Sequence, residues 1–385
     1  MPDKRYYTLQ FMKSNKQQKN SGHVNWNNGK IYPRILDDFN YFILGEGMSQ
    51  KILNVLYQSD DNYAMVTGVS IVSMCENNQH LDEINFYLID DGIAPSNKKK
   101  IESICNRYGR TLIYVDSAPI RNKLIELNVQ PWRGTYTTYY KLFAAAGLDM
   151  PTDRVLQIDG DTIINGPLDE LIEMDLGESV CAATYDCVLT DYKSTLGIPK
   201  DDYYYNCGVM LISKTNWLKY HCTEKIIKHL SSVRSRYFVV DQDIVNLLFR
   251  HNIKYMSPTY NFNSCFYIYG IDYVYKIYDL TDDIYIPRDE VTDVMEKGPL
   301  INHCMSAMTG RPWEHNSIHP QNGLFDRYLA LTEWDDSDKL NVRRTFVFRA
   351  QRIAYEHLPM SIYWHIHKFV LTLWMREQDR KCQKA

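Results

Sequence analysis

The stretch Val155-Leu-Gln-Ile-Asp-Gly-Asp-Thr-Ile-Ile164 decides how this chain is interpreted. Its apolar start is typical of a buried core strand, and two carboxylates, Asp159 and Asp161, follow where that strand ends. Open α/β sheets bind ligands at the carboxyl ends of their strands, and paired carboxylates hold hard divalent cations. The stretch therefore predicts a site for a cation that carries a diphosphate. The alternative is a pair of turn aspartates, because the same spacing recurs at 241–243 and 336–338.

Strand and helix patterns alternate on both sides of this stretch. Apolar runs predict strands at 51–57, 84–89, 111–115 and 208–212. Helical spacing predicts helices at 65–76, 97–108, 136–146 and 241–250. This alternation indicates an α/β fold built from βαβ units, with a mostly parallel central sheet flanked by helices.

Composition limits the classes of protein that remain. With 45% hydrophobic and 23% charged residues, the chain is an ordinary globular protein, and disorder is excluded for most of it. No signal peptide opens it, and no apolar run approaches the roughly 20 residues that span a bilayer. The nine Cys have irregular spacings without C-x-x-C, which favours neither a disulfide scaffold nor a zinc site. We expect a cytoplasmic protein that binds no nucleic acid.

The C-terminal region carries an unusual charge. Residues 341–385 contain nine Lys or Arg and three Asp or Glu, a net +6, interleaved with aromatic residues. This mixture is typical of interfacial helices on an anionic membrane, here the inner face of the cell membrane. The alternative is a helical hairpin, broken near Pro359, whose aromatic face packs on the body of the protein.

Several motifs occur in a characteristic order. They are the segment 53–63 (LNVLYQSDDNY), Thr138-Tyr-Tyr-Lys-Leu142, the stretch 155–164 with Pro167-Leu-Asp-Glu-Leu171, Tyr205-Asn-Cys-Gly-Val209, Asp241-Gln-Asp-Ile-Val-Asn246, and His303 followed by Gly310-Arg-Pro-Trp313. Together they resemble the family 8 glycosyltransferases, which include bacterial lipopolysaccharide galactosyl- and glucosyltransferases and glycogenin. Because each motif alone is weak, the order carries the resemblance.

The resemblance implies a GT-A fold, with a Rossmann-like sheet, and transfer of a hexose from a UDP-sugar with retention at the anomeric carbon. It also implies a metal ion held by Asp159, Asp161 and His303. Two carboxylates and one imidazole favour Mn²⁺, with Mg²⁺ as the alternative. The acceptor is then a glycan or a lipid-linked hydroxyl, as in polysaccharide or lipopolysaccharide synthesis.

The family pattern also assigns the residues that bind the nucleotide and the donor sugar. For the uridine these are Gln58, Asp60, Asp61, Asn62, Tyr63 and Gly160. For the diphosphate they are Gly310, Arg311 and Lys141, where the last two replace a Lys and an Arg of the family. For the sugar they are Asp186, Asn206, Asp241 and Gln242, and Gly208 is expected in an adjoining tight turn.

Gln242, Asp243 and Asp186 are the expected catalytic residues. An amide is a poor nucleophile, so we favour front-face attack on an oxocarbenium-like species, in which a β-phosphate oxygen accepts the proton of the acceptor. Asp241 is also expected to be the N-cap of its helix.

Rival classes fit the residues less well. A sugar-1-phosphate nucleotidyltransferase needs a Gly-rich loop after the first strand, and residues 58–63 contain no Gly. A glycoside hydrolase needs no cation, and a sugar-nucleotide-binding protein without activity is expected to lose a metal ligand. We therefore divide the chain into a polar extension over 1–47, a GT-A catalytic domain over 48–320 and a basic helical region over 321–385.

Overall fold

The computed structural model of the chain describes residues 50–232, 237, 239–305 and 308–383. The predicted N-terminal extension, residues 1–47, lies outside the described residues. The strands are β1 (Ile52–Ser59), β2 (Glu83–Asp90), β3 (Thr111–Asp116), β4 (Arg154–Ile158), β5 (Thr162–Ile164), β6 (Cys181–Tyr185), β7 (Tyr205–Ser213), β8 (Ile253–Tyr255), β9 (Phe262–Asn263) and β10 (Ile301–His303).

Helices follow most of these strands. They are α1 (Ala64–Asn77), α2 (Pro95–Arg107), α3 (Ala118–Glu126), α4 (Lys141–Ala144), α5 (Asp169–Glu173), α6 (Thr190–Thr195), α7 (Lys214–Lys219), α8 (Cys222–Ser232), α9 (Val240–Phe249), α10 (Cys265–Tyr269), α11 (Ile271–Tyr278), α12 (Arg288–Lys297), α13 (Asn322–Leu329), α14 (Phe346–His357) and α15 (Met360–Gln383).

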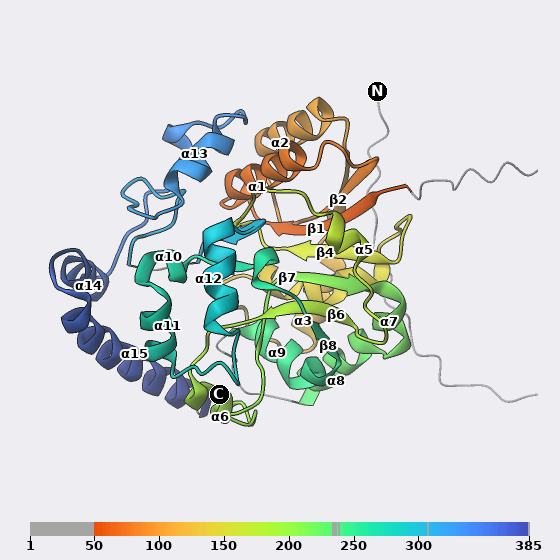
Figure 1. Cartoon of the computed structure of the whole chain (residues 1–385). Coiled ribbons are helices and arrows are strands. Elements are labelled where there is room, and N and C mark those ends of the chain that lie inside the picture. Colours follow the sequence, from red (N-terminus) through yellow and green to blue (C-terminus); the bar gives the residue numbers. More distant parts are fainter. Residues whose placement is uncertain (1–49, 233–236, 238, 306–307, 384–385) are drawn as a thin grey trace, which may run out of the picture.

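The central sheet has the strand order β3-β2-β1-β4-β7-β6-β8. Strands β1, β2, β3 and β4 run parallel, and β7 runs antiparallel to both of its neighbours. Helices cover both faces of this sheet (Figure 1). The predicted α/β class with a mostly parallel sheet is therefore confirmed.

Alternation along β1 explains why the sheet is covered on both sides. Leu53, Val55 and Tyr57 are buried in one core, which helices α1, α2 and α13 complete. Leu56 is buried in a second core on the opposite face, with side chains from α3, α4, α8 and α9. Since successive strand residues point to opposite faces, an almost continuously apolar strand requires two helical layers.

The topology places the functional cleft at one edge of the sheet. Strands β1 and β4 are parallel neighbours, with Leu56 beside Gln157, and the strand order reverses between them. Their carboxyl ends therefore lie together at a switch point, where crossover connections leave in opposite directions and open a crevice. Residues after Ser59 and after Ile158 meet there.

A small second sheet brings the distant histidine to this crevice. Its strand order is β5-β10-β9, and β5 begins directly after the Asp161 carboxylate. In the antiparallel β5–β10 pair, His303 lies opposite Thr162. The N–H of Cys304 also donates to the carbonyl of Asp161 at 2.9 Å. This pairing closes a gap of about 140 residues along the chain.

The helix predicted over 136–146 is wrong in detail. The segment is a 3₁₀ turn at Thr137–Tyr139, the short helix α4, and a second 3₁₀ turn at Ala145–Gly147. The hydroxyl of Thr137 donates to Asp91 at 2.5 Å, and the hydroxyl of Thr135 bonds the same carboxylate at 3.4 Å. Side-chain bonds of this kind compete with regular helical structure.

The C-terminal region packs differently before and after about residue 340. Phe325, Tyr328 and Trp334 belong to the first core, and a Cβ on Gly68 of α1 would lie 2.4 Å from the Trp334 ring. Helix α13 and Trp334, which follow the predicted boundary at residue 320, thus pack in the main core, and the boundary itself stays a prediction.

Helices α14 and α15 follow, separated at Leu358 and Pro359 (Figure 1). Tyr363 of α15 is buried and stacks near Tyr269 and Tyr273. Phe346 and Phe369, in contrast, are 77% and 64% exposed. An aromatic face therefore packs on the body, as the hairpin alternative predicts, while other apolar side chains are exposed. Within the described residues, no helix is long and apolar enough to cross a membrane.

Candidate active site

A cavity of about 410 Å³ opens at the switch point. Eleven of the residues predicted from the sequence line it: Gln58, Asp60, Tyr63, Asp159, Gly160, Asp161, Asn206, Asp241, Gln242, His303 and Arg311. Most of them come from the ends of β1, β4, β7 and β10 and from the start of α9, whereas Tyr63 directly precedes α1 and Arg311 lies in the loop after β10. The other predicted residues lie outside the cavity lining: Asp61, Asn62, Lys141, Asp186, Asp243 and Gly310.

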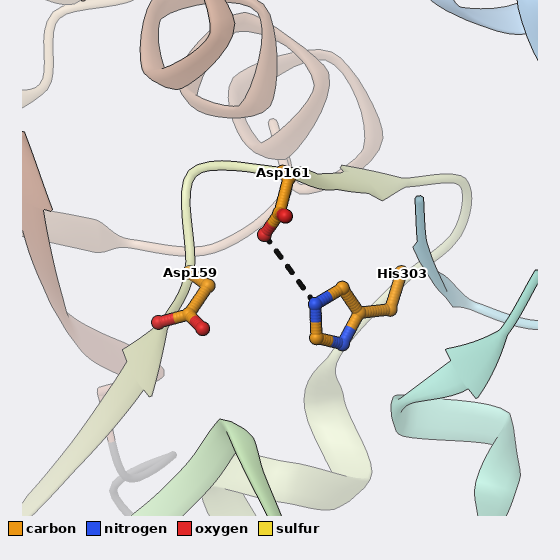
Figure 2. Close-up of side chains that lie close together, drawn as sticks. All are labelled: Asp159, Asp161 and His303. Carbon is orange, nitrogen blue, oxygen red and sulfur yellow. Dashed lines mark ion pairs between the residues drawn. The ribbon is translucent and has the colours of Figure 1, made fainter. Parts of the chain in front are cut away.

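Asp159, Asp161 and His303 all line the cavity and lie close together (Figure 2). One ligand atom of each lies within 4.8 Å of the others. The Nε2 of His303 is 3.3 Å from Oδ1 of Asp161. A set of two carboxylates and one imidazole matches the chemistry of a borderline-hard divalent cation such as Mn²⁺. The residues therefore fit the metal that the sequence predicted.

Hydrogen bonds fix which nitrogen of His303 can bind a metal. The Oδ1 of Asn206 accepts from the Gly208 N–H at 2.8 Å and from Nδ2 of Asn261 at 2.9 Å. The Oδ1 of Asn261 therefore faces Nδ1 of His303, at 2.9 Å. Because a carboxamide oxygen only accepts, Nδ1 carries a proton, and Nε2, which faces Asp161, is the nitrogen that can bind a metal once its own proton is lost.

Two glycines make room for this arrangement. A Cβ on Gly208 would lie 2.2 Å from Cε1 of His303. The tight turn predicted at Gly208 is thus wrong, because this glycine lies inside β7 and admits the imidazole ring. A Cβ on Gly160 would lie 2.5 Å from Oγ1 of Thr67, so the turn between the two aspartates packs directly on α1.

The charges of the three ligands depend on one another. Burial by itself raises the pKa of Asp161, but His303 and then Arg311 outweigh it and lower the pKa to about 2. Burial likewise opposes the protonation of His303, yet the neighbouring Asp161 carboxylate raises its pKa above the ordinary value. Burial raises the pKa of Asp159, although the Lys141 ammonium opposes this. A bound dication would replace the proton that this acidic pocket favours on His303.

Lys141 is buried next to the metal ligands and does not itself line the cavity. Its ammonium donates to Asp159 at 2.8 Å, to Asp241 at 2.9 Å and to the carbonyl of Cys207 at 2.9 Å. These contacts use all three of its hydrogens. Burial lowers the pKa of Lys141, but the two carboxylates outweigh burial and raise it. In this arrangement the ammonium holds two site carboxylates together, and the contact with the donor phosphate stays a prediction.

Two arginines face the cavity, and sequence reasoning found only one. Arg311 lies 3.8 Å from Asp161 and contacts the hydroxyl of Tyr63. Arg133 also lines the cavity, and its guanidinium lies 4.2 Å from the centre of the Trp132 ring. Burial and then repulsion from Arg311 lower the pKa of Arg133. Two cations held close together in a cavity favour an anionic ligand such as a diphosphate.

A tight turn and hydrogen bonds to the Asp91 carboxylate hold the loop that carries Arg133 in place. Trp132 and Thr135 pair with each other across a tight turn in which Arg133 and Gly134 have positive φ angles. The Asp91 carboxylate after β2 accepts bonds from Thr137 and from Arg121 at 2.5 and 2.6 Å. The Gly and the positive φ mark a turn, but nothing in the sequence shows that this turn reaches the cavity.

Residues of the predicted uridine loop have separate roles. Asp60 lines the cavity and accepts from the N–H of Tyr63 at 2.9 Å. Asp61 points elsewhere, since its Oδ1 accepts from the N–H of Ala94 and from Asn97. It thereby ties the loop to the start of α2. The Tyr63 ring lies edge-on to Trp313, at 5.8 Å between centroids.

Residues at the start of α9 divide between the cavity and the core. The Nε2 of Gln242 donates to Asp186 at 2.7 Å, and its Oε1 accepts from the Cys207 N–H at 3.0 Å. The side chain is thus held rigidly at the cavity wall. Asp241 is not the N-cap, because α9 begins at Val240 and the Asp241 carboxylate pairs with Lys141.

Asp243 is buried behind this wall. Its carboxylate accepts from the hydroxyls of Tyr192 and Tyr204, each at 2.5 Å, and from the Val239 N–H at 2.9 Å. Burial raises the pKa of Asp243 to about 6, against the effect of these donors. Its contacts therefore support the start of α9. Gly310 similarly adopts φ +80° and shapes the turn before Arg311.

Comparison with known proteins identifies the family. A sequence model described as glycosyl transferase family 8 matches residues 54–286. The chain belongs to glycosyltransferase family 8. General stress protein A of Bacillus subtilis is 25% identical over 74% of this chain and 96% of its own length. A lipopolysaccharide 1,2-glucosyltransferase of Escherichia coli is 30% identical over 55% of this chain and 63% of its own.

Solved structures agree with the fold of this family 8 protein. The crystal structure of the galactosyltransferase LgtC, in complex with donor and acceptor sugar analogs, aligns with a TM-score of 0.57. The alignment covers 73% of this chain and 97% of that chain, at 21% identity. The predicted GT-A fold is confirmed.

Proposed function

We propose that this family 8 protein transfers a hexose, galactose or glucose, from a UDP-sugar to a hydroxyl of a glycan or lipid-linked acceptor, with retention at the anomeric carbon. The single observation that carries the proposal is one cavity in which a metal triad and two arginines converge. The activities of similar proteins, among them lipopolysaccharide glucosyl- and galactosyltransferases, support the substrate class.

The diphosphate of the donor fits the cationic part of the cavity. Asp159, Asp161 and Nε2 of His303 would hold Mn²⁺ on the phosphates, and the ion would stabilise the negative charge that develops on departing UDP. Arg133 and Arg311 offer planar forks for the same phosphate oxygens. Lys141 contributes indirectly, because it keeps Asp159 ionised and in place.

In this proposal the uridine and the sugar contact other lining residues of the cavity. Asp60 and Tyr63 face the cavity beside Asp159, where they would contact the base and the ribose. Asn206 and Gln242 also line the cavity and would hold the sugar hydroxyls.

The reaction then needs no protein nucleophile. The bond between the anomeric carbon and the β-phosphate oxygen breaks, and the acceptor oxygen attacks from the same face. The proton of the acceptor passes to a β-phosphate oxygen. Gln242, held by Asp186 and by the Cys207 N–H, would position the sugar during this exchange.

The outer face of α14 and α15 supports a peripheral contact with a membrane that carries the acceptor. Phe346, Ile353, Ile362, Phe369 and Leu373 are each about half exposed or more. Basic residues flank them. Apolar side chains of this kind enter the headgroup region, while basic residues attract anionic lipid.

Two measurements test the transferase proposal. UDP with Mn²⁺ should raise the midpoint of thermal unfolding, and GDP should raise it much less. Asp161→Asn should lower metal-dependent release of UDP by about 10²-fold or more, because it removes a charged ligand. Asp336→Asn is the matched control, since this carboxylate lies in the other, exposed Asp-x-Asp pair. Full activity of Asp161→Asn, or full activity in excess chelator, contradicts the proposal.

A further inference from the structure

A second cavity, of about 730 Å³, lies where the segment after Trp313 meets the start of α14. Four arginines line it, namely Arg343, Arg344, Arg349 and Arg352, and we call it the arginine pocket. Helix α14 lies at the outer margin of the molecule, next to α15 (Figure 1). No residue of the metal triad lines this pocket.

The pocket holds more positive charge than its own carboxylates neutralise. Arg344 pairs with Glu314, and Arg352 pairs with Glu356 at 2.8 Å. Within the part of the chain that the structure describes, no carboxylate lies within 4 Å of the guanidinium nitrogens of Arg343 or Arg349. Two guanidinium groups are therefore available to a ligand. Such groups bind phosphate oxygens in a bidentate manner.

The walls of the pocket are fixed by the fold. The N–H of Leu340 donates to the carbonyl of Trp313 at 2.8 Å, and the His315 N–H donates to the carbonyl of Leu340 at 3.2 Å. The Arg344 guanidinium lies 4.4 Å from the centre of the Phe348 ring. The Glu314 side chain beneath it is only 11% exposed. These contacts hold one guanidinium and one aromatic ring in place before a ligand arrives.

The start of α14 adds to the attraction for an anion. The Thr345 hydroxyl caps this helix by accepting from the Phe348 N–H at 3.2 Å. The helix spans 12 residues, so its aligned peptide dipoles place partial positive charge at this end, where Arg344 and Arg349 also lie.

We propose that the arginine pocket binds the phosphate group of a phosphorylated saccharide. A volume of about 730 Å³ lies within the range of about 300–1,000 Å³ for organic ligands and exceeds the needs of a lone phosphate ion. The arginines recognise the phosphate, and the Phe348 ring offers a face for the sugar.

The arginine pocket and the donor cavity are lined by residues close together in the sequence. Arg311 lines the donor cavity, and Glu314, three residues later, lines the arginine pocket. The N–H of Glu314 donates to the carbonyl of Arg311 at 2.9 Å, so one turn separates the two sites. The phosphorylated saccharide would thus be part of the acceptor. That identification rests on the proposed transferase function, whereas the anion site does not.

Calorimetric titration of the full chain tests the proposal, with glucose 6-phosphate, glucose and inorganic phosphate as probes. Glucose 6-phosphate should bind at least tenfold more tightly than either of the others. The double variant Arg343→Gln/Arg349→Gln should weaken this binding at least tenfold. Both side chains are exposed, so the variant should remain folded. The double variant Arg376→Gln/Arg380→Gln on α15 makes the same charge change away from the pocket and should bind as the wild type does.

Other outcomes overturn the proposal. Equal weakening in the α15 control would indicate general surface charge. Equal affinity for inorganic phosphate and glucose 6-phosphate would show that the pocket does not recognise the saccharide. Binding of phosphatidylglycerol vesicles through Arg343 and Arg349, without binding of glucose 6-phosphate, would assign the pocket to a lipid headgroup. The variant Asp161→Asn should bind glucose 6-phosphate normally, so failure of the transferase proposal leaves this result unchanged.

Discussion

Replacing Lys141 by Met removes the ammonium that joins two buried carboxylates. The side chain of Lys141 is 2% exposed, and its Nζ lies 2.8 Å from Asp159 and 2.9 Å from Asp241. Removal of one partner from a buried ion pair leaves uncompensated charge and costs about 3–5 kcal/mol. We therefore expect Lys141→Met to lower the free energy of unfolding by about this amount in the absence of metal.

Lys193→Met is the matched control. Lys193 is also buried, but its Nζ donates to the backbone carbonyl of Asp202 at 2.7 Å. Its loss therefore leaves no buried carboxylate without its partner. Urea unfolding with chelator present should show a loss of roughly 1–2 kcal/mol for this control.

The deficit of Lys141→Met should also depend on pH. Burial already raises the pKa of Asp159, and without the opposing ammonium Asp159 takes up a proton more readily in the folded variant than in the unfolded chain. The variant then gains stability relative to the wild type as the pH falls, so its deficit should be smaller at pH 5 than at pH 8. A loss no larger than that of Lys193→Met, or a deficit that does not change with pH, would refute the bridging role.

Three further predictions concern residues around the cavity. Asn261→Leu should weaken Mn²⁺ binding about 10–100-fold by calorimetry, because His303 loses the acceptor that fixes its tautomer, whereas Asn261→Asp should keep most of the affinity. Gly208→Ala should also impair Mn²⁺ binding, since the new methyl group displaces the imidazole; unchanged affinity would contradict the close approach. The pKa of Asp243 is raised to about 6, so the folded state binds its proton more tightly and stability falls as the pH rises from about 4 to 6. Asp243→Asn should remove that component in pH-dependent urea unfolding, and activity should fall less than tenfold if Asp243 only supports α9.

Much of the site could be predicted from local sequence, because Asp159 and Asp161 directly follow a strand. Apolar strands alternate with helices along the chain, and a parallel sheet collects the carboxyl ends of its strands at one edge. That rule alone brings the loop after β1 and the Asp159–Asp161 turn together. The motif order supplied His303 and Arg311, which local patterns leave unconnected to the aspartates.

Tertiary structure alone decided which polar side chains face the cavity. Lys141, Asp243 and Asp61 occur in the same motifs as lining residues, yet none of the three lines the cavity. A motif specifies residue types at a spacing. The direction of a side chain depends on which partner satisfies it, and the partners lie on other elements.

By itself, the sequence determined the class of fold, the position of the cleft and the paired carboxylates of a candidate cation site, because strand periodicity and carboxylate spacing are local properties. Arg133 and Asn261 entered the site only through the fold. A turn held by Asp91 brings Arg133 to the cavity. A chain of three amide and imidazole contacts orients Asn261 against His303. Contacts between residues far apart in sequence leave no local pattern, and for that reason only the folded chain shows them.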